Sequence, residues 1–359
     1  MDSPTQDTPS DRCVGVHKGE GRDLRTLPKA HLHLHFTGSL RPATLHELAV
    51  RHRLRLPDSL LGGTPPELRA TDERGWFRFQ KLYDIARSVV RDESDIRRLL
   101  REAAEDEAAE GSGWLEIQVD PTSYAARLGG LTPTIELILD AAGEAAEATG
   151  VGLGVIVAAN RTRNPFDART LARLAAQYAG RGVVGFGLSN DERRGRAEEF
   201  APAFNIARRA GLVAVPHGGE LAGLSSVVAC LDALGAQRIG HGVRATEDPA
   251  VVERVAAAGV TLEICPMSNV RLGVYDRPEH VPLAVLCDAG VPVALGADDP
   301  LLFGSRLVAQ YEVARTALGF SDESLAELAR SSVRGSCAPG LVRARLLAGI
   351  DAWLAAPPP

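Results

Sequence analysis

Short apolar runs alternate with longer amphipathic stretches along most of the chain. Each apolar run is followed by a loop with polar or glycine residues and then by a stretch rich in Ala, Leu, Arg and Glu. This alternation is typical of βαβ units, in which helices connect parallel strands. Eight such units predict a (β/α)8 barrel of the TIM type. The predicted strands are residues 30–35, 114–119, 152–158, 183–188, 212–216, 238–240, 260–264 and 293–296.

The helical stretches between these runs end near glycines, as helices commonly do. Examples are residues 95–110, 137–148, 167–179, 198–210 and 248–258. An additional helical stretch, residues 72–91, lies between the first and second strands and carries Trp76, Phe79 and Tyr83. It predicts a helical lid over the barrel mouth. Aromatic packing against the outer helices of the barrel is an equally good interpretation, because apolar residues at helical spacing usually belong to a core.

Domain boundaries follow from the same pattern. Residues 24–354 form a single predicted domain, because no linker interrupts the alternation and a barrel of this size is one unit. Residues 1–23 are polar and contain Pro and Gly, which predicts a disordered leader, and residues 355–359 predict a frayed tail.

Charge and cysteine content narrow the function. The formal net charge of −6 argues against nucleic acid or an anionic membrane as a partner and favours small-molecule chemistry. The five cysteines show no CxxC spacing, so neither a disulfide framework nor a thiolate zinc site is indicated. The sequence shows neither a signal peptide nor a run long enough to span a membrane. We therefore expect a cytoplasmic protein in a reducing compartment.

Polar residues gather where the predicted strands end. His33 and His35 lie two positions apart, so they share one face of a strand. His217 and Asp298 end two other apolar runs, and barrels carry their active sites at this edge. A lone histidine would more often be a core residue, but burying several imidazoles without an ion or partners is costly. The set of His33, His35, His217 and Asp298 predicts one zinc ion.

Two neighbouring residues have other interpretations. His31 lies on the same strand face but one layer deeper, which favours a core or supporting role. Asp298-Asp299-Pro300 could also be a helix N-cap followed by a proline in the first turn, which would explain one aspartate but hardly both.

Five segments resemble the adenosine/AMP deaminase family of the amidohydrolase superfamily, in the same order and over nearly the whole chain from about Leu27. They are PKAHLHLHFTGS at 28–39, HGGE at 217–220, RIGHG at 238–242, CPMSN at 265–269 and DDP at 298–300. The resemblance implies a zinc barrel that hydrolyses the exocyclic amine of a 6-aminopurine nucleoside and releases ammonia. A cytidine-deaminase site is excluded, because it needs two cysteine ligands in PCxxC.

The resemblance also assigns roles to matching positions. Glu220 would protonate ring N1, His241 would orient the nucleophile, and Asp299 would bond N7. The backbone near Ser189 and Asn190 would meet purine N3.

Two positions depart from the family pattern. Thr37 stands where adenosine deaminases usually have an aspartate that contacts the ribose 5′-hydroxyl, and Asn190 stands where a glycine is expected. Loss of the aspartate favours a 5′-extended or anionic nucleoside. HLHLHFTGS also resembles the branch that deaminates 6-aminodeoxyfutalosine in menaquinone biosynthesis. An arginine of the lid stretch, Arg78, Arg87 or Arg91, could pair with the benzoate of that substrate, or could simply be solvated.

We therefore predict 6-aminodeoxyfutalosine as the substrate, ahead of adenosine or deoxyadenosine and then adenine or another modified purine. A purine-binding or signalling relative without turnover is an alternative of a different class. Metal-dependent amide or phosphoester hydrolysis on the same barrel is another alternative. The sequence leaves the oligomeric state open.

Overall fold

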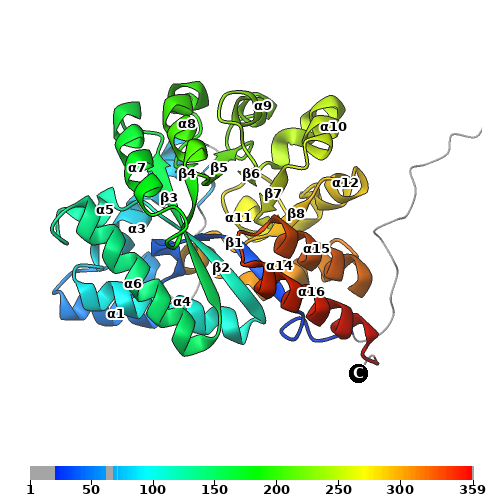
Figure 1. Ribbon diagram of the computed structural model, residues 1–359, viewed down its shortest axis with the longest axis horizontal. Helices are drawn as coiled ribbons and strands as arrows, with labels where there is room; N and C mark the ends of the chain where they lie inside the picture. Colours follow the sequence, from blue (N-terminus) through cyan, green and yellow to red (C-terminus); the bar gives the residue numbers. More distant parts are fainter. Residues whose placement is uncertain (1–20, 62–67, 71, 358–359) are drawn as a thin grey trace, which may run out of the picture.

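The computed structural model describes residues 21–61, 68–70 and 72–357. Eight parallel strands stand side by side in sequence order, with helices around them (Figure 1). This confirms the predicted (β/α)8 barrel, with every predicted strand in place. The strands are β1 Lys29–His35, β2 Ser112–Val119, β3 Gly152–Asn160, β4 Val183–Ser189, β5 Val213–Gly218, β6 Arg238–His241, β7 Thr261–Ile264 and β8 Val293–Leu295.

The first and last strands meet just beyond the end of β8. Leu34 pairs with Asp298 in parallel register. The amide of His35 donates to the Asp298 carbonyl at 2.9 Å, and the Asp298 amide donates to the His33 carbonyl at 3.0 Å. The junction between the two strands therefore coincides with three of the predicted zinc ligands.

Helices cover the outside of the barrel, so the strands are buried on both faces. Those in the first half of the chain are α1 Pro42–Arg51, α2 Asp58–Leu61, α3 Glu73–Ser88, α4 Glu93–Ala109, α5 Thr122–Ala125, α6 Leu131–Thr149 and α7 Pro165–Gln177. Those in the second half are α8 Ala201–Arg209, α9 Leu224–Asp232, α10 Pro249–Ala257, α11 Pro266–Arg271, α12 Leu283–Asp288, α13 Pro300–Phe303, α14 Leu307–Thr316, α15 Asp322–Gly335 and α16 Gly340–Ala355.

The predicted lid stretch forms α3. The Asp72 side chain caps its N-terminus by accepting from the Gly75 amide at 2.6 Å. Phe79 stacks on Phe303, with ring centroids 5.9 Å apart, and Phe77 points to solvent. The helix therefore packs against the barrel through its aromatic residues, and its movement as a lid stays a prediction.

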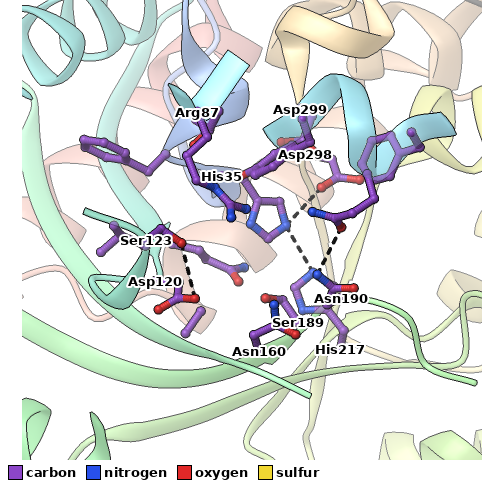
Figure 2. A pocket seen from close by; sticks show the side chains of 18 of the residues that line it. His35, Arg87, Asp120, Ser123, Asn160, Ser189, Asn190, His217, Asp298 and Asp299 are labelled. Carbon is purple, nitrogen blue, oxygen red and sulfur yellow. Dashed lines mark hydrogen bonds and ion pairs between the residues drawn. The ribbon is translucent and has the colours of Figure 1, made fainter. Parts of the chain in front are cut away.

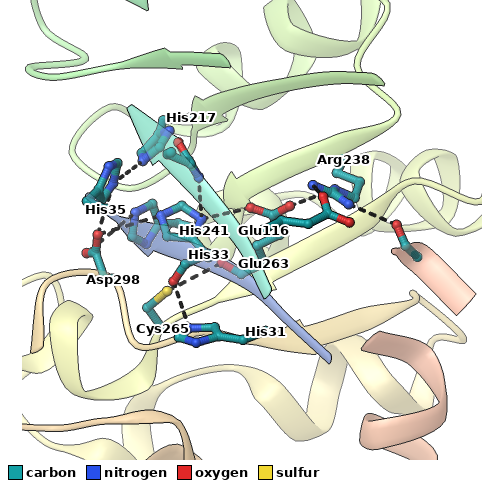
Figure 3. A network of polar contacts seen from close by, with 12 residues as sticks. His31, His33, His35, Glu116, His217, Arg238, His241, Glu263, Cys265 and Asp298 are labelled. Atoms are coloured by element: carbon teal, nitrogen blue, oxygen red, sulfur yellow. Dashed lines mark hydrogen bonds and ion pairs between the residues drawn. The ribbon is translucent and has the colours of Figure 1, made fainter. Parts of the chain in front are cut away.

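The barrel interior holds a layer of charge that the strand pattern did not predict (Figure 3). The Arg238 guanidinium binds Glu116 at 2.6 Å and Glu263 at 2.8 Å, and all three side chains are buried. The Glu116 carboxylate also accepts from the Trp114 indole at 2.9 Å. Mutual pairing and these additional hydrogen bonds are what make buried charges tolerable.

The chain ends are partly described. Residues 1–20 of the predicted leader and 358–359 of the predicted tail lie outside the described residues. The Arg22 guanidinium binds Asp322 at 3.0 Å and the carbonyls of Leu354 and Ala356, so residues near both ends are held together. In the part of the chain that the structure describes, no helix is long and apolar enough to cross a membrane.

Candidate active site

A cavity of about 80 Å³ opens at the carboxyl ends of the strands (Figure 2). Barrel enzymes carry their active sites at this edge. Strand ends supply one side of the cavity and α3 supplies another. Among the residues lining it are His35, Thr37, Trp76, Phe79, Gln80, Tyr83, Arg87, Asp120, Tyr124, Asn160, Ser189, Asn190, His217, Glu220, His241, Asp298 and Asp299.

The four predicted zinc ligands form one cluster. His33 and His35 project from the same face of β1, His217 lies at the end of β5, and Asp298 follows β8. The Nε2 atoms of His35 and His217 are 3.2 Å apart. Asp298 Oδ1 lies 3.2 Å from His35 Nε2 and 3.6 Å from His33 Nε2.

The spacing of these atoms fits a zinc ion. Ligand atoms bound tetrahedrally at zinc distances lie about 3.3 Å from one another, which matches the separations in the cluster. Among the residues that the structure describes, the buried Nε2 of His33 finds no hydrogen-bond partner. Burial lowers the pKa of His217 well below its usual value, so its ring is neutral and offers a lone pair. The four residues could therefore hold zinc.

Partners outside the predicted set orient two members of the cluster. Glu263 Oε2 lies 2.8 Å from His33 Nδ1, on the ring side opposite the cluster. The Ser268 hydroxyl donates to Asp298 Oδ2 at 2.5 Å. Such contacts fix ring orientation and tautomer in metal sites. The sequence signal for Glu263 is a carboxylate within an otherwise apolar strand, and Ser268 belongs to the CPMSN segment.

His31 takes no part in the cluster. Its Nδ1 lies 2.7 Å from Glu107 Oε1, while Nε2 accepts from the Ala297 amide at 2.9 Å. Both ring nitrogens are thus engaged, and the Nε2 contact supports the loop that leads to Asp298.

Glu220 and His241 lie together beside the cluster. Glu220 Oε1 is 3.5 Å from His241 Nε2. Burial, reinforced by the charge of Asp298, raises the pKa of Glu220 well above its usual value. Burial lowers the pKa of His241 to about 3. A carboxyl group that holds its proton more tightly than usual therefore stands next to a neutral imidazole, and the two can act as proton donor and acceptor.

Asp299 has a similar environment. Burial, together with the neighbouring Asp298 carboxylate, raises the pKa of Asp299 well above its usual value. Its Oδ1 is buried, and no described residue offers it a hydrogen bond. The backbone of Gly38 lies close to the Asp299 side chain, because a Cβ atom on Gly38 would lie 1.8 Å from Asp299 Oδ1. Asp299 is therefore a buried donor that faces the cavity.

Three of the site residues adopt left-handed backbone conformations. The φ angles of His241, Asp298 and Asn190 are 63°, 61° and 84°. Non-glycine residues with such angles concentrate at functional sites, where the surrounding structure holds them in place. At position 190 this angle explains why the family commonly has glycine there. Asparagine is among the few other residues that tolerate such an angle. The Asn190 amide donates to Gln80 Oε1 of α3 at 3.0 Å.

At the other side of the cavity, Thr37 is already engaged. Its hydroxyl lies 2.7 Å from the Tyr124 hydroxyl, and Tyr124 was not among the predicted site residues. Of the three arginines considered in the lid stretch, Arg87 lines the cavity, with its guanidinium over the Tyr83 ring.

The chain matches the profile of the Adenosine deaminase family over residues 28–353. It belongs to that family. A relative from Streptomyces virginiae, provisionally named an adenosine/adenine deaminase, is 68% identical over 93% of this chain and 98% of its own. The crystal structure of an adenine deaminase from Arthrobacter aurescens is 32% identical, with a TM-score of 0.83 over 92% of this chain and 99% of its own.

A third similar structure, an amidohydrolase from Burkholderia ambifaria with bound zinc, is 21% identical and shares the fold, with a TM-score of 0.82 over 97% of this chain and 99% of its own. Family membership makes this protein a hydrolytic deaminase that acts on a carbon–nitrogen bond. The comparisons do not confirm the predicted 6-aminodeoxyfutalosine branch, and the second-ranked alternative is closer to the relatives' names.

Proposed function

We propose that the protein hydrolyses the 6-amino group of adenine or adenosine, and that it uses one zinc ion held by His33, His35, His217 and Asp298. The observation that carries this proposal is the buried Glu220 carboxyl beside His241 and next to the four-residue cluster. When bound, the zinc ion would supply Lewis acidity, which makes a water molecule nucleophilic near neutral pH.

Protein groups supply the remaining chemistry. As water adds to carbon 6, the ring needs a proton at N1, and the raised pKa of Glu220 keeps that proton available. The neutral His241 can accept the proton that the water loses. Asp299 can donate to N7, which is an acceptor, because the raised pKa of Asp299 keeps its carboxyl protonated. His241 then returns its proton to the amine, the bond between carbon 6 and the amine breaks, and the amine leaves as ammonia. The remaining hydroxyl proton on carbon 6 passes to the Glu220 carboxylate, which leaves the 6-oxo product with its proton at N1.

Adenine is our first choice of substrate. Thr37 offers a ribose no carboxylate, and its hydroxyl lies 2.7 Å from the Tyr124 hydroxyl. The similar Arthrobacter structure is an adenine deaminase, and the Streptomyces relative is named for both adenosine and adenine. No comparison supports 6-aminodeoxyfutalosine, although Arg87 in the cavity wall would suit an anionic substituent.

The test is ammonia release by zinc-loaded protein offered adenine, adenosine, deoxyadenosine and 6-aminodeoxyfutalosine in parallel. We expect the highest kcat/KM for adenine. A preference for 6-aminodeoxyfutalosine would restore the substrate that the sequence predicted, and a preference for adenosine would move the protein to the nucleoside branch. Inactivity on all four by protein that holds one zinc per chain would overturn the proposed function.

A further inference from the structure

The turn that carries Glu220 is irregular, and its conformation needs an explanation. It follows β5 and precedes α9, so Glu220 belongs to neither a strand nor a helix. Gly219, just before it, has a φ of 70°, which turns the chain sharply. Since a catalytic proton donor must be held closely in place, something has to fix this turn.

One carboxylate oxygen receives the backbone donors of the turn. The amides of Glu220, Leu221 and Ala222 all donate to Glu192 Oε2, at 2.9, 2.7 and 2.8 Å. The other oxygen, Oε1, accepts from the Ser226 hydroxyl at 3.2 Å. Consecutive backbone N–H groups that converge on one anion form a nest, and hydrogen bonds to a charged acceptor are stronger than neutral ones.

Glu192 comes from a different part of the barrel. It lies in the loop after β4, while the turn follows β5, and it is buried. The preceding strand end is held as well, because the buried Arg161 side chain donates to the His217 carbonyl. His217 and Glu220, three residues apart, are thus held by separate side chains from outside their own segment.

We propose that Glu192 is a positioning residue for deamination, which fixes the turn so that the Glu220 carboxyl points at the ring nitrogen of the substrate. This inference rests on the proposed function, in which Glu220 is the proton donor. The Glu192 charge also adds to the burial and the Asp298 charge that raise the pKa of Glu220.

The first test compares Glu192→Gln, Glu192→Asp and the control Ser226→Ala. Glu192→Gln removes the negative charge, and Glu192→Asp keeps the charge on a shorter side chain, farther from the backbone of the turn. We expect either change to lower kcat about 10- to 100-fold, the scale of a small misplacement of a reacting group. KM and the zinc content should change little, because His217 keeps its own support. Ser226 donates to Glu192 Oε1, which is not the oxygen that accepts from the backbone of the turn. The kcat of Ser226→Ala should therefore stay close to that of the wild type.

A double-mutant cycle separates positioning from general damage. If Glu192 acts through Glu220, Glu192→Gln should cause no further loss of kcat in a Glu220→Gln background. The same loss in both backgrounds, or a wild-type kcat for zinc-loaded Glu192→Gln and Glu192→Asp, would overturn the proposal.

Hydrogen exchange provides a readout that does not depend on activity. The amides of residues 220–222 should exchange slowly in the wild type and faster in Glu192→Gln, while those of β5 are unchanged. If the wild type deaminates no purine, the proposed function fails, and amide exchange still decides whether Glu192 holds the turn. Unchanged exchange would overturn that part of the proposal.

Discussion

At the scale of single residues, the proposed deamination depends most on the proton that Glu220 carries. Glu220→Gln keeps the shape of the side chain but cannot transfer a proton to the substrate. We expect kcat to fall about 10²- to 10⁴-fold, the usual contribution of a general acid. Steady-state ammonia release measures this, and zinc content should equal that of the wild type. A kcat within a few-fold of the wild type would remove Glu220 from its proposed role.

The pH dependence of the reaction follows from the same carboxyl group. Because the pKa of Glu220 is raised, the group keeps its proton to higher pH than an ordinary carboxyl group and loses it as the pH rises further. His241, whose pKa is lowered to about 3, stays neutral over the same range. We therefore expect kcat/KM to be flat near neutral pH and to fall on the alkaline side. A profile of kcat/KM against pH that keeps rising there would contradict this assignment.

In the proposed function, zinc affinity should depend on Glu263, which does not line the cavity. Glu263→Gln would weaken the contact that orients His33, and we expect zinc to bind about 10- to 100-fold more weakly. Competition with a chelator measures this affinity. Glu116→Gln is the matched control, because Glu116 pairs with the same arginine but has no contact with His33. Equal zinc affinities in the two variants would show that the Glu263 contact has no special role.

At the scale of elements, the eight strands could be predicted from the sequence because each is a buried apolar run. The positions of His35, His217 and Asp298 at the ends of strands could be predicted for the same reason. The orientation of α3 could not, since its aromatic residues suited either a lid or the outer wall. The turn at Glu220 could not be predicted either, because Glu192, which holds it, comes from a different loop.

Helix α3 is tied across the cavity by the hydrogen bond between Gln80 and Asn190. Gln80→Ala removes this bond, which is worth about 1 kcal/mol, so we expect KM to rise about 2- to 10-fold with kcat little changed. Phe77→Ala on the exposed face of the same helix is the control and should leave KM unchanged. Steady-state kinetics with adenine distinguish the two variants. An unchanged KM in Gln80→Ala would mean that the bond does not help to hold α3 over the substrate.

At the scale of the whole molecule, the buried ion network joins three strands. Arg238→Met would leave the Glu116 and Glu263 carboxylates buried without their cation, and we expect a loss of about 3–5 kcal/mol in the free energy of unfolding. Denaturant titration measures the loss. Arg330→Met, which removes a pair with the exposed Asp351, should cost about 0–1 kcal/mol. Similar losses in both variants would argue against a structural role for the network.

The contacts within this network could not be predicted from the sequence. Residues 116, 238 and 263 lie on β2, β6 and β7, so the sequence shows each as a charged residue in a separate predicted strand. Arg238 and Glu263 come from neighbouring strands, and only the barrel brings Glu116 of β2 to them. The surroundings of Thr37 could not be predicted from the sequence either, because Tyr124, whose hydroxyl lies 2.7 Å from that of Thr37, comes from a distant part of the chain.

The meeting of β1 with the residue after β8 has a consequence for how the protein is made. Asp298 joins His33 and His35 only when the first and last strands pair. A ribosome synthesises the histidines early and the aspartate near the end, so a growing chain has no complete set of ligands for most of its synthesis. If the protein binds zinc as proposed, zinc loading is therefore a late event, and a chain that stops before residue 298 would leave its histidines without their carboxylate partner.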